Sequence, residues 1–368
     1  MQKVKKKRPV RYFDYNLLFI IIFLVGFGLV MLYSTSSYSA QIRFGDSAFY
    51  LKKQLAAVAI GFAALLITSF IPYKLYRKLS ILIYAISFVL CALVLFAGQS
   101  YNGSARWLKL GPISFQPSEI AKVGMILVIA AIIYKIPKSM GRFSTVIKVL
   151  LIILPIVVMV AYSNLSTGII IMGIAVCMVF VASPKTLQFF LLAAAVSVLG
   201  ILFIYVEQYR AERIMIWLNP EAYEKGYQTL QGLYAIGSGG LFGKGLGESI
   251  QKLGFLPEAQ NDMIFSIICE ELGIFGAICV IILFLLMIWR FMIIANNAPD
   301  LFGALIVTGI MAHIAIQVIL NIAVVTNTIP NTGITLPFIS YGGTSVAILL
   351  AEMGIALNVS RGIKLEVI

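Results

Sequence analysis

Short polar breaks divide the sequence into ten long apolar runs. The runs cover approximately residues 15–35, 54–71, 80–97, 117–134, 149–162, 168–183, 188–206, 263–289, 301–325 and 343–359. A bilayer core of about 30 Å is crossed by about 20 apolar residues in a helix, and a helix satisfies its own backbone hydrogen bonds within lipid. The pattern therefore predicts an all-α polytopic membrane protein with ten transmembrane helices, folded as one integral membrane domain over residues 1–368.

The charged residues indicate the topology. They make up only 12% of a chain that is 61% hydrophobic, which excludes an ordinary soluble domain. The net charge of +13 does not predict a nucleic-acid partner, because basic residues in a membrane protein first report its orientation. Most Lys and Arg residues flank the spans on the side of the amino terminus. We therefore expect both termini to be cytoplasmic, and the connections 98–116, 207–262 and 326–342 to lie outside.

The connection 207–262, between the seventh and eighth predicted helices, is too long for a plain linker. Aromatic and aliphatic residues recur along it, so we expect it to pack as short helices at the membrane interface. It ends in the stretch GSGGLFGKGLGESIQKLGFLPEAQNDMIFSIICEELG, residues 237–273. The glycines lack the lysine-serine/threonine ending of a nucleotide-binding loop, so no nucleotide cofactor is predicted.

Asp262 stands where this loop meets the eighth predicted helix, within reach of water, lipid headgroups and protein. The positive end of that helix favours an anion, which would keep Asp262 ionised and able to accept a proton. Two interpretations remain open at this point. Asp262 is either a catalytic carboxylate, or it caps the helix, alone or with Asn261.

Further ionisable groups lie in or near the hydrocarbon, where each costs several kcal/mol unless it is paired or hydrated. Glu119 and Lys122 share one face of the fourth span, either as a structural ion pair or with Lys122 as a counter-charge for an anionic substrate. Glu270 and Glu271 point about 100° apart, so they cannot both face one partner; either both make structural hydrogen bonds, or one pairs across the bundle while the other lines a cavity. His313 and Glu352 indicate either a buried hydrogen bond between helices or a proton path.

The segment PNTGITLPFISYGGTS, residues 330–345, places prolines and glycines at the entry to the last span. Such irregular backbone at membrane depth either lines a cavity or forms a tight re-entrant turn. The candidate substrate-binding residues of the three outer connections and the fourth span are Arg106, Lys109, Gln116, Glu119, Lys122, Lys244, Lys252, Glu258, Pro330 and Ser340.

Three stretches in order, NGSARWLKLGPISFQPSEIAK, the 237–273 stretch and LPFISYGGTS, resemble the SEDS family of FtsW, RodA and SpoVE. The amino-acid sequence of the middle stretch is most similar to the FtsW and SpoVE branch. The resemblance implies a multi-pass protein of the bacterial cytoplasmic membrane that polymerises lipid II into peptidoglycan at the outer face. Its implied partners are a class B penicillin-binding protein and other division proteins.

The family's essential aspartate follows a Pro-Glu motif, and that position is Asp262 here. Two departures are visible. Gln260 and Asn261 stand where many members have His-Thr, and Met263 stands where a phenylalanine is usual, so no role of that histidine carries over to this chain.

The hypothesis that follows makes Asp262 the general base toward the 4-hydroxyl of the acceptor sugar, with inversion at the lipid-linked donor. A divalent cation, Mg²⁺ or Mn²⁺, held by Asp262 and Glu258 is the other role open to these carboxylates. Positive side chains would receive the departing pyrophosphate. A lipid II flippase and a non-catalytic division scaffold are the alternative functions.

Overall fold

The computed structural model describes residues 12–101, 104–110, 113–190, 194 and 214–364. Nine helices in these ranges are long and apolar enough to cross a membrane. They are α1 (Tyr15–Phe44), α2 (Phe49–Phe70), α3 (Tyr73–Ala97), α4 (Pro117–Lys135), α5 (Phe143–Ser163), α6 (Leu165–Ala182), α10 (Ile264–Asn296), α11 (Leu301–Val325) and α12 (Gly343–Ser360). Nine of the ten predicted spans fall on these helices. The seventh, 188–206, lies almost wholly outside the described residues.

The helices α4, α11 and α12 form the interior of the bundle. Of the most apolar 18-residue stretch of each of these helices, between 61% and 78% is buried, whereas for α2 and α3 only 28% and 22% is buried. α12 packs along α2, and α4 packs against α3, α6 and α11. The peripheral helices expose large apolar side chains, such as Phe96 at 88%, as expected of surfaces that face lipid.

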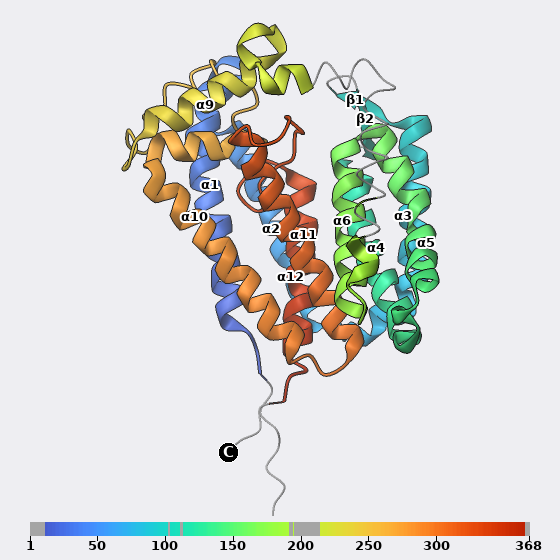
Figure 1. Cartoon of the computed structure of the whole chain (residues 1–368). Helices are drawn as coiled ribbons and strands as arrows, with labels where there is room; N and C mark the ends of the chain where they lie inside the picture. Colours follow the sequence, from blue (N-terminus) through green and yellow to red (C-terminus); the bar gives the residue numbers. More distant parts are fainter. Residues whose placement is uncertain (1–11, 102–103, 111–112, 191–193, 195–213, 365–368) are drawn as a thin grey trace, which may run out of the picture.

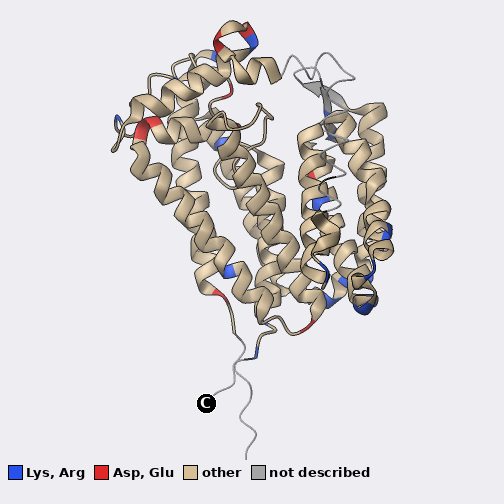
Figure 2. Ribbon diagram, viewed as in Figure 1, with Lys and Arg blue, Asp and Glu red and all other residues tan. Residues whose placement is uncertain are grey.

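The two ends of the described chain meet at one end of the bundle, where the amide of Tyr12 donates to the carbonyl of Ile363. Lys and Arg residues gather at this same end (Figure 2). This distribution agrees with a cytoplasmic placement of both termini, since basic residues concentrate on the inner side.

The opposite end carries the outer connections (Figure 1). The helical fold class is confirmed by these spans, and the connection 98–116 adds a small antiparallel sheet, in the order β1-β2-β3, that the sequence did not predict. Its strands are β1 (Gln99–Tyr101), β2 (Ser104–Leu110) and β3 (Ile113–Phe115). In β2 and β3, Lys109 pairs with Ser114. Outside the bilayer, water is available to the free edges of such a sheet, so the rule that only helices span lipid does not apply to it.

The described part of the long connection before α10 folds as expected into short helices. Two single-turn 3₁₀ helices, η2 (Pro220–Ala222) and η3 (Glu224–Gly226), lead into α9 (Tyr227–Gly239). α9 packs against the start of α10. The side chain of Trp217 donates to the carbonyl of Asn327, and the amide of Asn327 donates back to the carbonyl of Trp217. The connections before α10 and before α12 are thereby joined.

Candidate functional site

α10 is broken at Gly273, where φ is 68° and ψ is −168°. A break inside a helix frees backbone carbonyls before it and amides after it, and these need partners at the edge of a membrane. The glycine-rich loop supplies them through four hydrogen bonds: Lys244 N to Glu270 O (2.9 Å), Gly245 N to Glu271 O (3.0 Å), Ile274 N to Gly240 O (3.0 Å) and Phe275 N to Leu241 O (3.1 Å). The loop therefore acts as a cap for both halves of the broken helix.

The close fit of this loop accounts for its glycines. A Cβ at Gly239 would lie 1.9 Å from the carbonyl oxygen of Cys269, and one at Gly243 would lie 2.1 Å from that of Glu271. Gly243 also has a φ of +78°, which other residues rarely adopt. The glycines thus serve a backbone-to-backbone contact rather than a phosphate.

Two ion pairs fasten the loop to α10; the Lys252 pair is buried, whereas the Lys244 side chain is 30% exposed. Lys244 Nζ lies 2.7 Å from Glu270 Oε1, and Lys252 Nζ lies 2.7 Å from Glu271 Oε1. Ser34 in α1 donates to the Glu271 carboxylate at 2.7 Å, which extends the second pair to a third element. As expected, the two glutamates have different partners. The two lysines, which the sequence suggested as pyrophosphate ligands, are each matched to a carboxylate about two turns along α10 from its outer start.

Asp262 lies at the meeting point of three segments. The buried Asn321 side chain in α11 donates to the carbonyl of Asp262 at 2.8 Å and to that of Ile334 at 2.7 Å. Two residues before Asp262, the carbonyl of Gln260 accepts the backbone amide of Tyr341 at 2.9 Å. Residues far apart in the sequence therefore fix the backbone on either side of this carboxylate.

The Asp262 side chain is 8% exposed, and its Oδ1 atom has no hydrogen-bond partner among the described residues. Burial, together with a smaller effect of the nearby charge of Glu258, raises the pKa of Asp262 to about 7. This direction is opposite to the one expected from the positive end of the helix, because burial disfavours the ionised carboxylate. A carboxyl group with a pKa near 7 suits a general base at neutral pH.

Neither Asp262 nor Asn261 caps α10. The capping residue is Met263, which makes no side-chain cap hydrogen bond. Asn261 instead donates from its side chain to the Glu258 carboxylate. Glu258 holds a positive φ of 55°, which turns the chain back toward Asp262. The capping interpretation is thus excluded, and within the described ranges the Oδ1 atom of Asp262 has no hydrogen-bond partner that would account for its burial.

Glu258 and Asp262 are the acidic side chains that a divalent cation could use at this place. In the parts of the chain that the structure describes, no group of three or more His, Cys, Asp or Glu side chains is arranged to hold a metal. Two carboxylates fit Mg²⁺ or Mn²⁺ only if water and phosphate oxygens complete the coordination.

Glu119 and Lys122 form a buried ion pair with Nζ and Oε1 2.9 Å apart. The hydroxyl of Ser345, at the start of α12, donates to the second oxygen of Glu119 at 3.0 Å. Through Ser345, the ion pair thus connects α4 to α12, as expected of a structural ion pair rather than of a substrate-binding charge.

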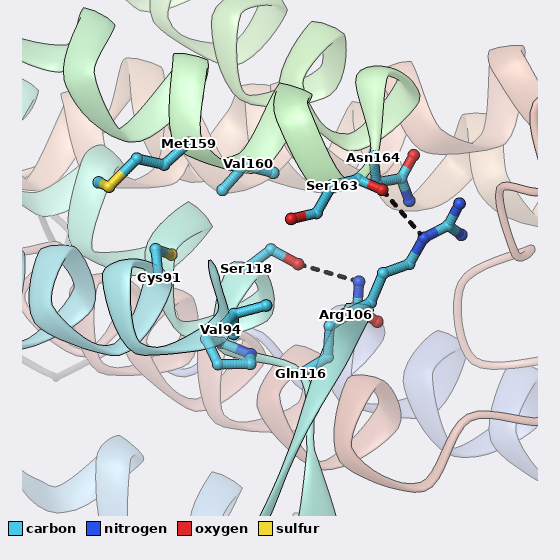
Figure 3. A pocket seen from close by; sticks show the side chains of 10 residues that line it. Cys91, Val94, Arg106, Gln116, Ser118, Met159, Val160, Ser163 and Asn164 are labelled. Carbon is cyan, nitrogen blue, oxygen red and sulfur yellow. Dashed lines mark hydrogen bonds between the residues drawn. The ribbon is translucent and has the colours of Figure 1, made fainter. Parts of the chain in front are cut away.

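Arg106 and Gln116 line a small pocket between the sheet and the outer ends of α3, α4 and α5, together with Ser118 and Asn164 (Figure 3). The Nε of Arg106 donates to the carbonyl of Ser163 at 3.3 Å, and Gln116 donates to the hydroxyl of Ser118 at 3.0 Å. Lys109 is exposed on β2. These residues form a polar rim at the same end of the bundle as Asp262.

Ser340 and Pro330 belong to the re-entrant connection between α11 and α12. Ser340 is 2% exposed, and its hydroxyl accepts the amide of Leu336 at 2.8 Å, which closes a turn around Phe338 with its φ of 64°. Pro330 is half-buried before this turn. The hydroxyl of Ser340 is therefore occupied within the protein in this structure.

A family model described as cell cycle protein, FtsW/RodA/SpoVE, matches residues 15–365 of the chain. The chain belongs to this family. Its members include stage V sporulation protein E of Bacillus subtilis (strain 168), which is 40% identical over 364 residues, or 97% of this chain and 98% of that protein. A probable peptidoglycan glycosyltransferase FtsW of Trichlorobacter lovleyi is 38% identical over 98% of this chain and 96% of its own length.

Solved structures of FtsW/RodA/SpoVE proteins share the fold. One chain, from a peptidoglycan synthase complex described as coordinating polymerization and crosslinking, matches with a TM-score of 0.81 and 27% identity, over 95% of this chain and 98% of that chain. The rod shape determining protein RodA of Thermus thermophilus matches with a TM-score of 0.67 and 26% identity, over 95% and 97% of the two chains. The protein is accordingly a multi-pass protein of the cytoplasmic membrane.

Proposed function

We infer that this chain is a peptidoglycan glycosyltransferase that polymerises lipid II into β-1,4 glycan strands at the outer face of the bacterial cytoplasmic membrane. Its FtsW relatives are named peptidoglycan glycosyltransferases, and they cover nearly the whole chain. The observation that carries the proposal is the buried Asp262 carboxylate, whose Oδ1 atom has no hydrogen-bond partner among the described residues. It lies two residues before α10, which begins at the end of the bundle opposite the termini (Figure 1).

Asp262 acts as the general base. A sugar hydroxyl is too weak an acid to ionise at neutral pH, so a positioned base contributes about 10²- to 10⁴-fold in rate. The acceptor's 4-hydroxyl loses its proton to the carboxylate as its oxygen attacks the anomeric carbon of the donor. The bond to the lipid pyrophosphate breaks on the opposite side, so the reaction inverts the configuration and needs no glycosyl-enzyme intermediate.

The leaving pyrophosphate needs positive charge. Lys244 and Lys252 each pair with a glutamate, and we propose Lys109 and Arg106 on β2, at the same outer end of the bundle, as the contacts for the pyrophosphate. Gln116 and the half-buried Pro330 complete the proposed substrate contacts on the polar rim and in the re-entrant connection. These groups lie in the outer connections, where a headgroup anchored in the outer leaflet arrives.

Binding of a divalent cation, Mg²⁺ or Mn²⁺, is the alternative role that we propose for these carboxylates. Glu258 and the unpartnered Oδ1 of Asp262 would then hold the ion, in place of Asp262 taking the proton, and the ion would supply positive charge for the pyrophosphate. Electron paramagnetic resonance of Mn²⁺ titrated into the purified protein tests this directly. Binding that is lost in Glu258→Gln supports the site, and the same binding in wild type and variant contradicts it.

The proposed partner is a class B penicillin-binding protein, which crosslinks the strands, along with other division proteins. The structural similarity to a chain of a synthase complex that couples polymerization to crosslinking supports a crosslinking partner. The similarity to SpoVE and FtsW proteins supports a role in sporulation or division rather than elongation.

The deciding experiment measures glycan product from purified protein and lipid II. Asp262→Asn keeps the shape of the side chain and removes its charge, so the product should fall to background. Asp46→Asn is the matched control, since Asp46 is an exposed carboxylate that pairs with the exposed Lys52 and accepts the amide of Ala48. Full activity of Asp262→Asn would reject the catalytic role. If the wild-type protein transports a non-polymerisable lipid II analogue but makes no polymer, the flippase is favoured instead. If the wild-type protein neither polymerises nor transports lipid II but still forms a complex with its partner, the scaffold is favoured.

A further inference from the structure

The basic side chains at the end of the bundle that carries the termini differ in whether the fold gives them partners. Arg290 pairs with the buried Asp14, with Nη2 and Oδ2 2.6 Å apart, and Lys74 Nζ lies 3.9 Å from Asp300 Oδ2. The guanidinium of Arg361 lies over two aromatic rings, 4.9 and 4.6 Å from their centroids. Each of these cations therefore has a partner within the protein.

Four exposed cations elsewhere at this end form a group that we name the basic corner. Lys135 ends α4, and Lys138 lies in the 3₁₀ helix η1 (Pro137–Gly141) that follows it. Arg142 precedes α5, and Lys185 comes three residues after the end of α6. All four residues are exposed. Figure 2 shows Lys and Arg gathered at the foot of this half of the bundle.

Contacts between the backbone of η1 and the exit of α6 hold the basic corner together. The hydroxyl of Ser183 donates to the carbonyl of the buried Met140 at 3.1 Å. A Cβ at Gly141 would lie 3.3 Å from the ring of Pro184. The cations that neighbour these residues in the sequence therefore share one surface.

The basic corner has no acidic partner in the described part of the chain. Residues 120–206 include six Lys and Arg residues and no Asp or Glu. One of the six, Lys122, pairs with Glu119 near the outer end of α4. The other five are the basic corner and Lys148 in the second turn of α5, and they form no ion pair within the described ranges. Membrane orientation does not account for this lack of acids, because it depends on the cations and hardly on nearby Asp or Glu.

Exposed apolar side chains adjoin the basic corner. Ile136, Phe143 and Leu187 are 38%, 47% and 70% exposed. Leu151 and Val158, at 55% and 57% exposure, continue from Phe143 along one face of α5, because steps of eight and seven residues are each about two turns. A ligand that fits this surface has a negatively charged head and an apolar chain that runs along α5.

We propose that the basic corner binds the phosphodiester of an anionic phospholipid, such as phosphatidylglycerol, in the leaflet on the side of the termini. One acyl chain lies against the exposed face of α5. The headgroup supplies the counter-charge that the described residues do not, and it fixes the depth of η1 at the membrane surface. Each Lys or Arg close to an anionic lipid surface contributes about fivefold in affinity. This inference goes beyond the glycosyltransferase reaction and does not depend on it.

The first test is native mass spectrometry of the full chain in a mild nonionic detergent, titrated with phosphatidylglycerol or with phosphatidylcholine of the same acyl chains. The wild type should bind one phosphatidylglycerol at least about tenfold more tightly than phosphatidylcholine. Equal affinities for the two lipids overturn the proposal. Glycerophosphoglycerol, which is the headgroup without its chains, should bind much more weakly than the lipid. If it binds as tightly, the site takes a soluble phosphodiester and the assignment to a lipid is wrong.

The second test removes charge from the basic corner. Lys138→Gln combined with Arg142→Gln takes away two exposed cations, and the affinity for phosphatidylglycerol should fall about 25-fold, or about fivefold for each charge. The matched control is Lys74→Gln combined with Lys364→Gln, which removes two exposed cations from elsewhere at the same end and should change the affinity little. Equal losses in the two double variants would show attraction to the overall positive charge only, and would refute a defined site.

A charge-keeping variant separates an electrostatic effect from a structural one. Lys138→Arg combined with Arg142→Lys should keep the affinity within about threefold of the wild type, because both positive charges remain. A loss as large as that of the glutamine variant overturns the proposal. Asp262→Asn should bind phosphatidylglycerol as the wild type does, so failure of the catalytic proposal and failure of this one are read from different measurements.

Discussion

Replacement of Asp262 by asparagine should stabilise the folded protein while it removes activity. Burial raises the pKa of Asp262 from 3.8 to about 7. The gap of about 3 pH units, at 1.36 kcal/mol per unit, amounts to about 4 kcal/mol. A carboxyl whose pKa is higher in the folded state binds more protons there than in the unfolded state. Its contribution to stability is therefore complete below pH 3.8 and is lost as the pH rises through 7.

The assay is thermal unfolding of the full chain in a mild detergent at several values of pH from 5 to 8.5. The wild-type melting temperature should fall over this range by more than that of Asp262→Asn, because only the wild type must ionise a buried carboxylate. At pH 8 the variant should be the more stable protein by up to about 4 kcal/mol, and at pH 5 the difference should shrink to about 2 kcal/mol, because pH 5 is only about 1.2 units above the pKa of 3.8 in the unfolded chain. Asp46→Asn, which changes an exposed carboxylate, should follow the wild type throughout.

A variant that is less stable than the wild type at pH 8 would refute this reasoning. It would mean that the Asp262 carboxylate forms a stabilising contact in its charged form, with a bound cation as the leading candidate. Addition of EDTA distinguishes the two cases, because it would then lower the melting temperature of the wild type alone.

Three further changes test the frame around the site, each by thermal unfolding in detergent. Glu271→Gln should cost about 3–5 kcal/mol because it leaves the Lys252 ammonium buried without its partner, and adding Lys252→Met should recover part of the loss; equal stability of single and double variants would contradict the pairing. Gly273→Ala should cost at least about 1–3 kcal/mol, since its φ is +68° and a Cβ would lie 2.4 Å from two backbone atoms, whereas Gly26→Ala, with open space around it, should be neutral. Asn321→Leu should cost about 1–3 kcal/mol for each of the two carbonyls it leaves unpartnered, and a loss below 1 kcal/mol would argue against their burial.

The transmembrane helices were predictable because the thickness of the hydrocarbon sets the length of an apolar run. The predicted starts of the second and third spans came late, at 54 and 80, whereas α2 and α3 begin at Phe49 and Tyr73. At these two starts the helix extends beyond the apolar run into polar residues, because backbone hydrogen bonds form regardless of side-chain polarity. The small sheet was missed since its strands are three to seven residues long and carry little periodicity.

The break in α10 could not be predicted from the apolar pattern, because the neighbours of Gly273, Leu272 and Ile274, are both apolar. A signal did exist in the same stretch. It holds two lysines, Lys244 and Lys252, and five carboxylates, of which only Glu270 and Glu271 lie well inside the apolar run, where a carboxylate most needs a partner. Matching them would have predicted the two ion pairs and removed these lysines from the proposed pyrophosphate contacts.

Asp262 was identifiable from its position and from the family resemblance, but its environment was not. Its burial depends on Asn321, which is 59 residues further along the chain, and on the connection that includes Ile334. No local pattern reports a contact at that separation. The direction of its pKa shift, which decides how the group behaves near neutral pH, therefore had to come from the structure.

Three acidic side chains at or just before the start of α10, Asp262, Glu270 and Glu271, have different surroundings, which distinguish a structural role from a catalytic one. A buried, unpaired carboxylate costs several kcal/mol, and a lysine partner removes much of that cost. The fold supplies such partners to Glu270 and Glu271, which hold the loop in place. It supplies none among the described residues to Asp262, although the same loop carries both lysines. A lysine paired with Asp262 would lower the pKa of the carboxyl group and weaken it as a base. The lack of a lysine partner therefore follows from the reaction we propose rather than from the stability of the fold.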